Sequence, residues 1–193
     1  DQDAVADDQV FLAGHSFGGT MAPRIAERDG NLAGVVMLAP GPVRSFAETL
    51  RDQNTHLNEI GAISDEQLEE SLELADRIER RDIADDEALF LGGREFYESF
   101  ADYDRTGTAA DLSVPRLLLF GGQDWQVTVE NDLPVWEDAL ADDSGATFTV
   151  YDDLNHMFQQ STGEKTQEEY TNPDAVLDER VIEDVVEFVQ TNS

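Results

Sequence analysis

Short apolar runs alternate along this chain with longer stretches whose apolar residues recur at helical spacing. Four of these runs are rich in β-forming residues and are bounded by glycine, proline or aspartate: VFLAG (10–14), GVVMLA (34–39), RLLLFG (116–121) and TFTVY (147–151). Continuous apolar runs of this length are typical of strands that are buried on both faces. Because strands that alternate with helices form parallel sheets, the pattern predicts an α/β fold.

Three helices are predicted to flank the sheet. The first runs from about Phe17 to Arg28, contains Pro23, and ends at the turn Asp29-Gly30-Asn31. A second is indicated by apolar residues on one helical face, which are Leu133, Trp136 and Leu140. The last is predicted to open at the start signal Asn172-Pro173-Asp174 and to carry an apolar stripe, which consists of Leu177, Val181, Val185 and Phe188.

The connection between the second and third runs, residues 41–113, is far longer than a simple crossover needs. It has helical stripes of its own, and one of them opens with a capping box from Ser64 to Gln67. We interpret residues 44–105 as a helical, lid-like insertion within a single domain that spans 1–193. The alternative, a disordered linker, would leave these apolar stripes with nothing to pack against.

Acidic residues dominate the charge of the chain: 43 acidic residues face 12 basic ones, for a net charge of −31. Such a surface repels nucleic acid and anionic membranes, and no apolar run approaches the ~18–20 residues of a membrane span. We therefore expect neither kind of partner. Self-repulsion is relieved as screening shortens from ~10 Å at 0.1 M salt to ~3 Å at 1 M, so the composition predicts a halophilic, salt-adapted protein. The absence of cysteine excludes disulfides and thiolate metal sites.

One stretch, AGHSFGG at residues 13–19, fits the nucleophile-elbow pattern G-x-S-x-G with Ser16 as its serine. A predicted strand enters the motif and a predicted helix leaves it, which is the context in which the pattern has a mechanism. The turn would expose the serine hydroxyl above the strand ends, and the glycines would avoid collisions with side chains. The helix N-terminus would then face an anion that develops at the attacked carbon.

A serine hydroxyl needs a base, and the chain offers three histidines. His15 adjoins the serine, and we expect its side chain to project away from the hydroxyl in a structural role. His56 falls in the insertion, and we expect it at the surface. His156 follows the fourth predicted strand in a loop that can reach Ser16, so we predict it as the base.

A carboxylate must orient that histidine. Asp124 directly follows the third predicted strand, at the carboxyl end where the sites of open parallel sheets assemble. Asp152 and Asp153 are the alternatives, since both are close to His156 in sequence. We favour Asp124, which gives the chain order serine, aspartate, histidine that is described for α/β-hydrolases.

The stretches VFLAGHSFGGTMAPRIAERDGNLAGVVMLAP, LLLFGGQDWQVT and LNHMFQQSTGE, followed by EEY, resemble the C-terminal part of α/β-hydrolase-fold esterases allied to dienelactone hydrolases and acyl-peptidase-like enzymes. The resemblance is weakest over residues 44–100. It implies a carboxylester hydrolase with Ser16 as nucleophile, His156 as base, Asp124 as orienting acid, and the main-chain N–H of Phe17 as one oxyanion donor. It further implies a small acyl ester as substrate and neither a cofactor nor a metal.

That family's sheet has eight strands, and this chain is similar from just ahead of the fifth. We therefore expect the N-terminal strands to be missing from the chain, together with the loop that supplies a second oxyanion donor. The strand over residues 10–14 would then be an open edge, which predicts self-association or a partner chain there.

Two functional hypotheses follow, an ester hydrolase and a non-catalytic remnant or interaction module of the same fold. A thioesterase or peptidase would use the same triad. Trp125, Met157 and Phe158 flank the predicted acid and base, where they either line an acyl pocket or pack in the core.

Overall fold

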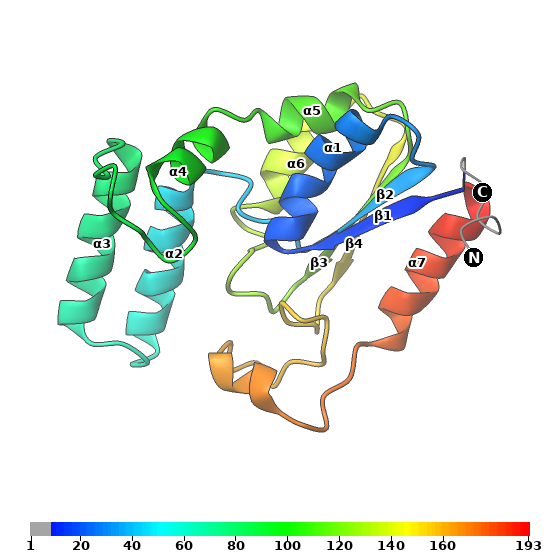
Figure 1. Cartoon of the computed structure of the whole chain (residues 1–193). Coiled ribbons are helices and arrows are strands. Elements are labelled where there is room, and N and C mark those ends of the chain that lie inside the picture. The colour runs from blue at the N-terminus through cyan, green and yellow to red at the C-terminus, as the bar shows by residue number, and fades with distance from the viewer. Residues whose placement is uncertain (1–8) are drawn as a thin grey trace. The chain divides into compact units, whose positions relative to one another are not determined.

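The computed structural model describes residues 9–193, and its centre is a parallel four-stranded sheet (Figure 1). The strands lie in the order β1-β2-β3-β4, with bounds Phe11–His15, Gly34–Leu38, Arg116–Gly121 and Ala146–Tyr151. Their registers pair residues in parallel throughout, for example His15 with Leu38 and Leu38 with Leu119. Each strand begins and ends within one residue of its predicted run, because the apolar runs are bounded by residues that stop strands.

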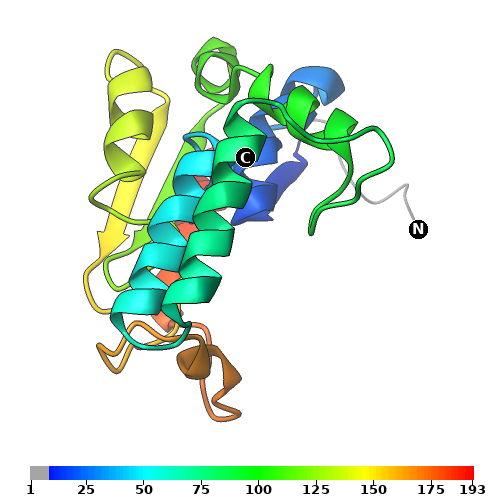
Figure 2. The same cartoon turned by 90° about the vertical axis from the view of Figure 1, so that its left-hand side faces the viewer.

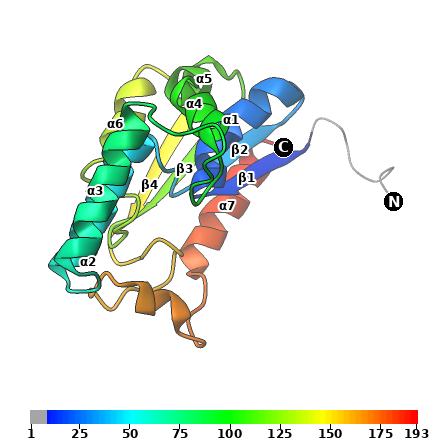
Figure 3. The same ribbon diagram turned by 60° about the vertical axis from the view of Figure 1, so that its left-hand side comes forward.

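Four α-helices belong to the same compact unit, which comprises residues up to Val43 and Arg105–Ser193. They are α1 (Phe17–Asp29), α5 (Arg105–Asp111), α6 (Leu133–Ala139) and α7 (Glu179–Thr191). Figures 1 and 3 show α1, α5 and α6 on one face of the sheet and α7 on the other. A short 3₁₀ helix, η2 (Gln167–Thr171), precedes α7. The first predicted helix is confirmed: α1 ends at Asp29 and is capped by Gly30, which has a left-handed φ of 74° and donates its N–H to the carbonyl of Ala26.

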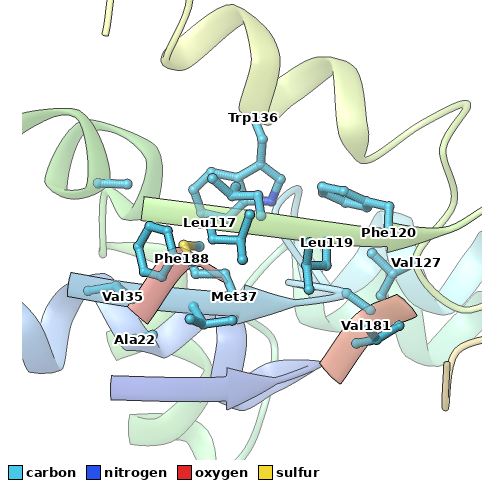
Figure 4. Packing of buried hydrophobic residues seen from close by; sticks show 14 of the residues in the cluster. Ala22, Val35, Met37, Leu117, Leu119, Phe120, Val127, Trp136, Val181 and Phe188 are labelled. Carbon is cyan, nitrogen blue, oxygen red and sulfur yellow. The ribbon is translucent and has the colours of Figure 1, made fainter. Parts of the chain in front are cut away.

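Apolar residues from the strands and from both helical layers form one core (Figure 4). Trp136 of α6 is fully buried, and its indole N–H donates a 3.0 Å hydrogen bond to the carbonyl of Pro40. On the α7 side, the ring of Phe188 packs edge-on against Phe11 of β1 with centroids 5.9 Å apart. The core therefore fixes the strand ends at which the predicted catalytic residues lie.

The predicted start of the last helix is wrong. The helix begins at Glu179, after Asp178 caps it by accepting a hydrogen bond from the N–H of Arg180. Asn172 instead forms a local turn in which its side chain accepts from the N–H of Asp174. Leu177, which was assigned to the apolar stripe, lies outside the helix and is exposed, whereas Val181 and Phe188 are buried as predicted.

The second compact unit spans Arg44–Asp104 and contains α2 (Phe46–Glu59), α3 (Asp65–Glu79) and α4 (Arg94–Ala101). Helices α2 and α3 lie side by side along their length (Figure 2). The predicted capping box from Ser64 to Gln67 is present, and a second one joins Ser45 to Glu48. The ring of Phe46 packs against a cluster of α4 side chains, which are Phe96, Tyr97 and Phe100.

Within residues 9–193, no helix has both the length and the apolar character that crossing a membrane requires. In this described part of the chain, β1 is an outer strand that pairs with β2 along one side.

Candidate active site

Ser16 forms the turn between β1 and α1. Its backbone has φ 55° and ψ −123°, a conformation that is rare and strained for any residue other than glycine. The turn is held by the hydrogen bond from the Ser16 N–H to the carbonyl of Leu38, 2.8 Å, and by the Thr20 N–H, which donates to the Ser16 carbonyl. The strand–turn–helix context that the motif needs is therefore present.

The glycines around Ser16 are not equivalent. A Cβ atom on Gly14 would lie 2.3 Å from the carbonyl oxygen of Gly18, and one on Gly19 would lie 3.0 Å from that of Gly14. Among the described residues, a Cβ atom on Gly18 would meet nothing within 4 Å. The expectation that the motif glycines avoid collisions is thus right for Gly14 and wrong for Gly18. The crowded second glycine is Gly19, because there the start of α1 passes close to the backbone of Leu38 and Pro40.

His156 and Asp124 form a buried pair. The Nδ1 atom of His156 lies 2.7 Å from Oδ2 of Asp124, and the two residues are 4% and 2% exposed. The other carboxylate oxygen accepts hydrogen bonds from the N–H groups of Gln126, 2.7 Å, and Val127, 3.0 Å. Both oxygens of Asp124 are therefore used, and the carboxylate is fixed in its orientation toward the imidazole.

Two glycines at the end of β3, Gly121 and Gly122, allow the loop that carries Asp124 to approach the loop that carries His156. A Cβ atom on Gly121 would lie 2.5 Å from the carbonyl of Leu154, and one on Gly122 would lie 2.7 Å from Cα of Asp152. At this close approach the Gln123 N–H donates to the carbonyl of Leu154, 2.9 Å. In the sequence GGQD, the two glycines thus allow the acid and the base to approach, because neither glycine has a side chain.

The turn that presents His156 is rigidly built. The side-chain oxygen of Asn155 accepts from the N–H groups of Met157, 2.9 Å, and Gln159, 3.2 Å. Phe158 has a left-handed φ of 54°, its N–H donates to the Asn155 carbonyl, and its own carbonyl accepts from the N–H of Asp178. Asn155 and the positive φ of Phe158 were not foreseen, because neither feature has a distinctive local pattern.

The recorded link between the Ser16 turn and His156 runs through the neighbouring residue His15. Among the described residues the Ser16 hydroxyl makes no hydrogen bond to His156, which is common for such pairs without substrate. His15, next to Ser16, places its ring 4.7 Å from that of His156 and its Nε2 atom 2.8 Å from the His156 carbonyl oxygen. Burial lowers the pKa of His15.

The alternative site residues lie elsewhere or are otherwise engaged. Asp153 pairs with Arg180 at 2.9 Å, and Asp152 is exposed. His56 lies half-buried on α2, in the unit 44–104. Among residues 9–193, the carboxylate bonded to the imidazole of His156 is that of Asp124 and not that of Asp152 or Asp153.

An aromatic pair lies beside His156. The ring of Trp125 stacks on that of Tyr170 with an interplanar angle of 7°, and Gln126 Nε2 donates to the Tyr170 hydroxyl, 3.2 Å. Burial raises the pKa of Tyr170. Glu169 holds this segment in place by accepting hydrogen bonds from the N–H and hydroxyl of Thr162. Tyr170 was not identified from the sequence, because 45 residues separate it from its stacking partner.

Two of the three predicted pocket residues differ sharply in burial. Phe158 is 1% exposed and belongs to the core, where its ring meets those of His15 and Tyr151. Met157 is 43% exposed. Packing therefore describes Phe158, while Met157 points its apolar side chain into solvent beside the histidine.

The fold is that of an α/β protein, with a parallel sheet and helices on both of its faces. It has nucleophile-elbow geometry, because a strained serine lies between a strand and a helix and a buried His–Asp pair lies at the strand ends. The sequence matches the family model described as "Alpha/beta hydrolase family" over residues 1–169. The chain belongs to this family.

Relatives of the chain extend beyond the region that it matches. Esterase EstD of Thermotoga maritima is 35% identical over 181 residues, which cover 94% of this chain and 42% of EstD. The chain therefore spans less than half the length of this relative.

Solved structures share the fold. The esterase Pf2001 of Pyrococcus furiosus aligns with a TM-score of 0.55 at 15% identity, over 98% of this chain and 57% of its own. A monoacylglycerol lipase of Paleococcus ferrophilus gives a TM-score of 0.55 at 19% identity, over 96% and 70%. At these identities the likeness concerns the fold alone.

Proposed function

We propose that this chain carries the catalytic triad of a serine carboxylester hydrolase, with Ser16 as nucleophile, His156 as general base and Asp124 as orienting acid. The observation that carries the proposal is the buried 2.7 Å contact between His156 Nδ1 and Asp124 Oδ2. It is supported by the strained backbone of Ser16 at the end of β1. The similarity to EstD supports an ester as substrate and favours the esterases of the family over its other enzymes.

The bond to Asp124 assigns the two ring nitrogens of His156 their roles. Because an ionised carboxylate only accepts hydrogen bonds, Nδ1 carries a proton and Nε2 has the lone pair that can take the proton of Ser16. The alkoxide oxygen then attacks the ester carbonyl carbon, and Asp124 stabilises the imidazolium that forms. His156 hands the proton to the leaving alkoxide as the C–O bond breaks, which leaves an acyl-serine and an alcohol.

Water completes the cycle with His156 again as base. The water attacks the acyl-serine carbonyl, which releases the acid and the free serine. The negative charge on the carbonyl oxygen is stabilised at the N-terminus of α1, where we assign the main-chain N–H of Phe17 as one oxyanion donor. Trp125 and Met157, which directly follow Asp124 and His156 in the chain, are proposed to contact the substrate. The helical insertion over residues 44–105 is proposed to be lid-like.

A single hydrolysis assay tests whether Asp124, and not Asp152, is the orienting acid. Initial rates on p-nitrophenyl acetate are compared for wild type, Ser16→Ala, Asp124→Asn and the matched control Asp152→Asn. We expect Ser16→Ala to abolish turnover, Asp124→Asn to lower it about 10⁴-fold, and Asp152→Asn to leave it unchanged. Equal losses in the two Asp→Asn variants would overturn the triad.

The same apparatus cleaves thioesters and amides, so the substrate class needs its own comparison. Rates on matched oxygen ester, thioester and anilide substrates with one acyl group answer it. Fastest turnover of the oxygen ester supports the assignment, whereas preference for the thioester or anilide would reassign the enzyme within the family.

One observation favours a second function, that of an interaction module. The outer edge of β1 has no strand paired to it within the described residues, and Val10 at its start is exposed. A second copy or a partner chain pairing there is detected by sedimentation of wild type against Ala13→Pro, because proline removes a main-chain donor. A defined complex without serine reactivity would favour this function over hydrolysis.

A further inference from the structure

We propose that His15 is a positioning residue: by hydrogen bonding to the main-chain carbonyl of His156, it holds the base in place beside the turn that carries Ser16. The inference rests on the proposed function, since it gives His15 a task in activating Ser16. The contact on which the inference rests is separate from the contact between His156 and Asp124. His15 Nε2 lies 2.8 Å from the His156 carbonyl oxygen across 141 residues of sequence, and the two ring centroids are 4.7 Å apart.

The acceptor in this contact fixes the protonation of the donor. A carbonyl oxygen can only accept, so Nε2 of His15 carries a proton. Burial lowers the pKa of His15 and so favours the neutral ring. A neutral ring also suits the reaction: His156 becomes an imidazolium when it takes the serine proton, and a second positive charge 4.7 Å away would oppose that step.

The place of His15 in the chain makes the contact a link between nucleophile and base. His15 is the last residue of β1 and is directly followed by Ser16. It pairs in register with Leu38 of β2, whose carbonyl also accepts from the Ser16 N–H. The peptide that sets the position of the His15 ring therefore also sets the strained turn of Ser16.

His15 and Asp124 hold different parts of His156. Asp124, on the loop after β3, fixes the ring through Nδ1, while His15, at the end of β1, fixes the main chain. If the His15 donor were lost, the loop could shift relative to Ser16 while the ring stayed bonded to Asp124. A displacement of about 1 Å in a catalytic group can cost ~100-fold in rate. Loss of the hydrogen bond from His15 should therefore have a measurable effect on the rate.

The test compares two replacements of His15. Gln retains an amide donor at a reach similar to that of Nε2, whereas Phe keeps the ring shape without a donor. The readout is the rate of fluorophosphonate labelling of Ser16, resolved into the binding constant and the maximal rate, with His56→Gln as the matched control. We expect His15→Phe to lose ~10- to 100-fold in maximal rate with little change in binding, and His15→Gln to recover most of that loss.

A spectroscopic readout keeps the inference testable without activity. Nitrogen-edited imidazole NMR at neutral pH should show His15 as the neutral Nε2–H tautomer. It should also show the Nδ1 proton of His156 in wild type and His15→Gln, with broadening in His15→Phe. A folded His15→Phe variant that labels like wild type, or a His15 proton on Nδ1, would overturn the inference. Absence of labelling in every variant, with the NMR pattern intact, would count against the proposed function instead.

Discussion

The crowding around Ser16 predicts opposite effects for two glycine-to-alanine changes four residues apart. Within residues 9–193, a methyl group on Gly18 would meet nothing within 4 Å, and Gly18 lies in the first turn of α1. Alanine gains roughly 0.5–1 kcal/mol over glycine within a helix, because glycine loses more backbone entropy on folding. For a chain of this size that gain corresponds to a rise of about 2–4 °C per kcal/mol in the unfolding midpoint.

Gly14→Ala is the opposing variant. Its methyl group would lie 2.3 Å from the carbonyl oxygen and 2.5 Å from the carbonyl carbon of Gly18, and backbone atoms cannot turn aside as a side chain can. The elbow must therefore open, at a cost of about 1–3 kcal/mol or more, as for other overpacked positions. We expect the unfolding midpoint of Gly14→Ala to fall by several degrees while that of Gly18→Ala rises.

Tryptophan fluorescence during thermal unfolding is the assay. The chain has two tryptophans, Trp125 and Trp136, and both lie in the unit that contains the elbow. The signal therefore reports this unit rather than residues 44–104. Destabilisation of Gly18→Ala by as much as Gly14→Ala would refute the steric reasoning.

Three further predictions concern buried charge, pH and salt. Arg116 is buried on β3 and bonded to Asp143, and the carbonyls of Ala109 and Leu112 also accept hydrogen bonds from it. Because these two acceptors remain, Asp143→Asn should lower the free energy of unfolding toward the low end of the ~3–5 kcal/mol typical of broken buried pairs. A change under about 1 kcal/mol in denaturant unfolding would contradict this. Because burial lowers the pKa of His15 below its ordinary 6.5, the contribution of His15 to stability is full above pH 6.5 and is lost as pH falls through the lowered pKa. The free energies of unfolding of wild type and His15→Gln should therefore converge or cross as the pH is lowered through this range. Parallel curves of free energy against pH would refute this. With a net charge of −31, stability should still rise between about 0.1 and 1 M NaCl, where the screening length falls from ~10 to ~3 Å. A flat unfolding midpoint over that range would argue against salt adaptation.

The sheet was predictable because its signals are local. Each strand is an apolar run bounded by glycine, proline or aspartate, and the structure follows these bounds to within one residue. Helix α5 was missed because its sequence, RTGTAAD, has no apolar stripe and contains a glycine. The start of α7 was misplaced because Asn172-Pro173-Asp174 resembles a helix start, whereas the cap that forms is Asp178, whose own N–H is bonded to Phe158.

In the candidate site, the position of Asp124 directly after the third predicted strand led to its assignment, since the carboxyl ends of parallel strands meet at one edge. What the sequence did not indicate depends on contacts between distant segments. The stacking of Tyr170 on Trp125 and the bond from His15 to His156 have no local pattern. Gly19 was likewise overlooked, because it lies one residue beyond the five-residue motif and part of its crowding comes from Leu38 and Pro40, which are distant in sequence.

The central claim is that Ser16 is an activated nucleophile. Its most direct test is labelling of the chain with a fluorophosphonate probe in multimolar salt, for wild type and Ser16→Ala, with the modified peptide mapped by mass spectrometry. We expect a single labelled site at Ser16 that disappears in the variant. A folded wild-type chain that stays unlabelled, or that is labelled equally in Ser16→Ala, would contradict it.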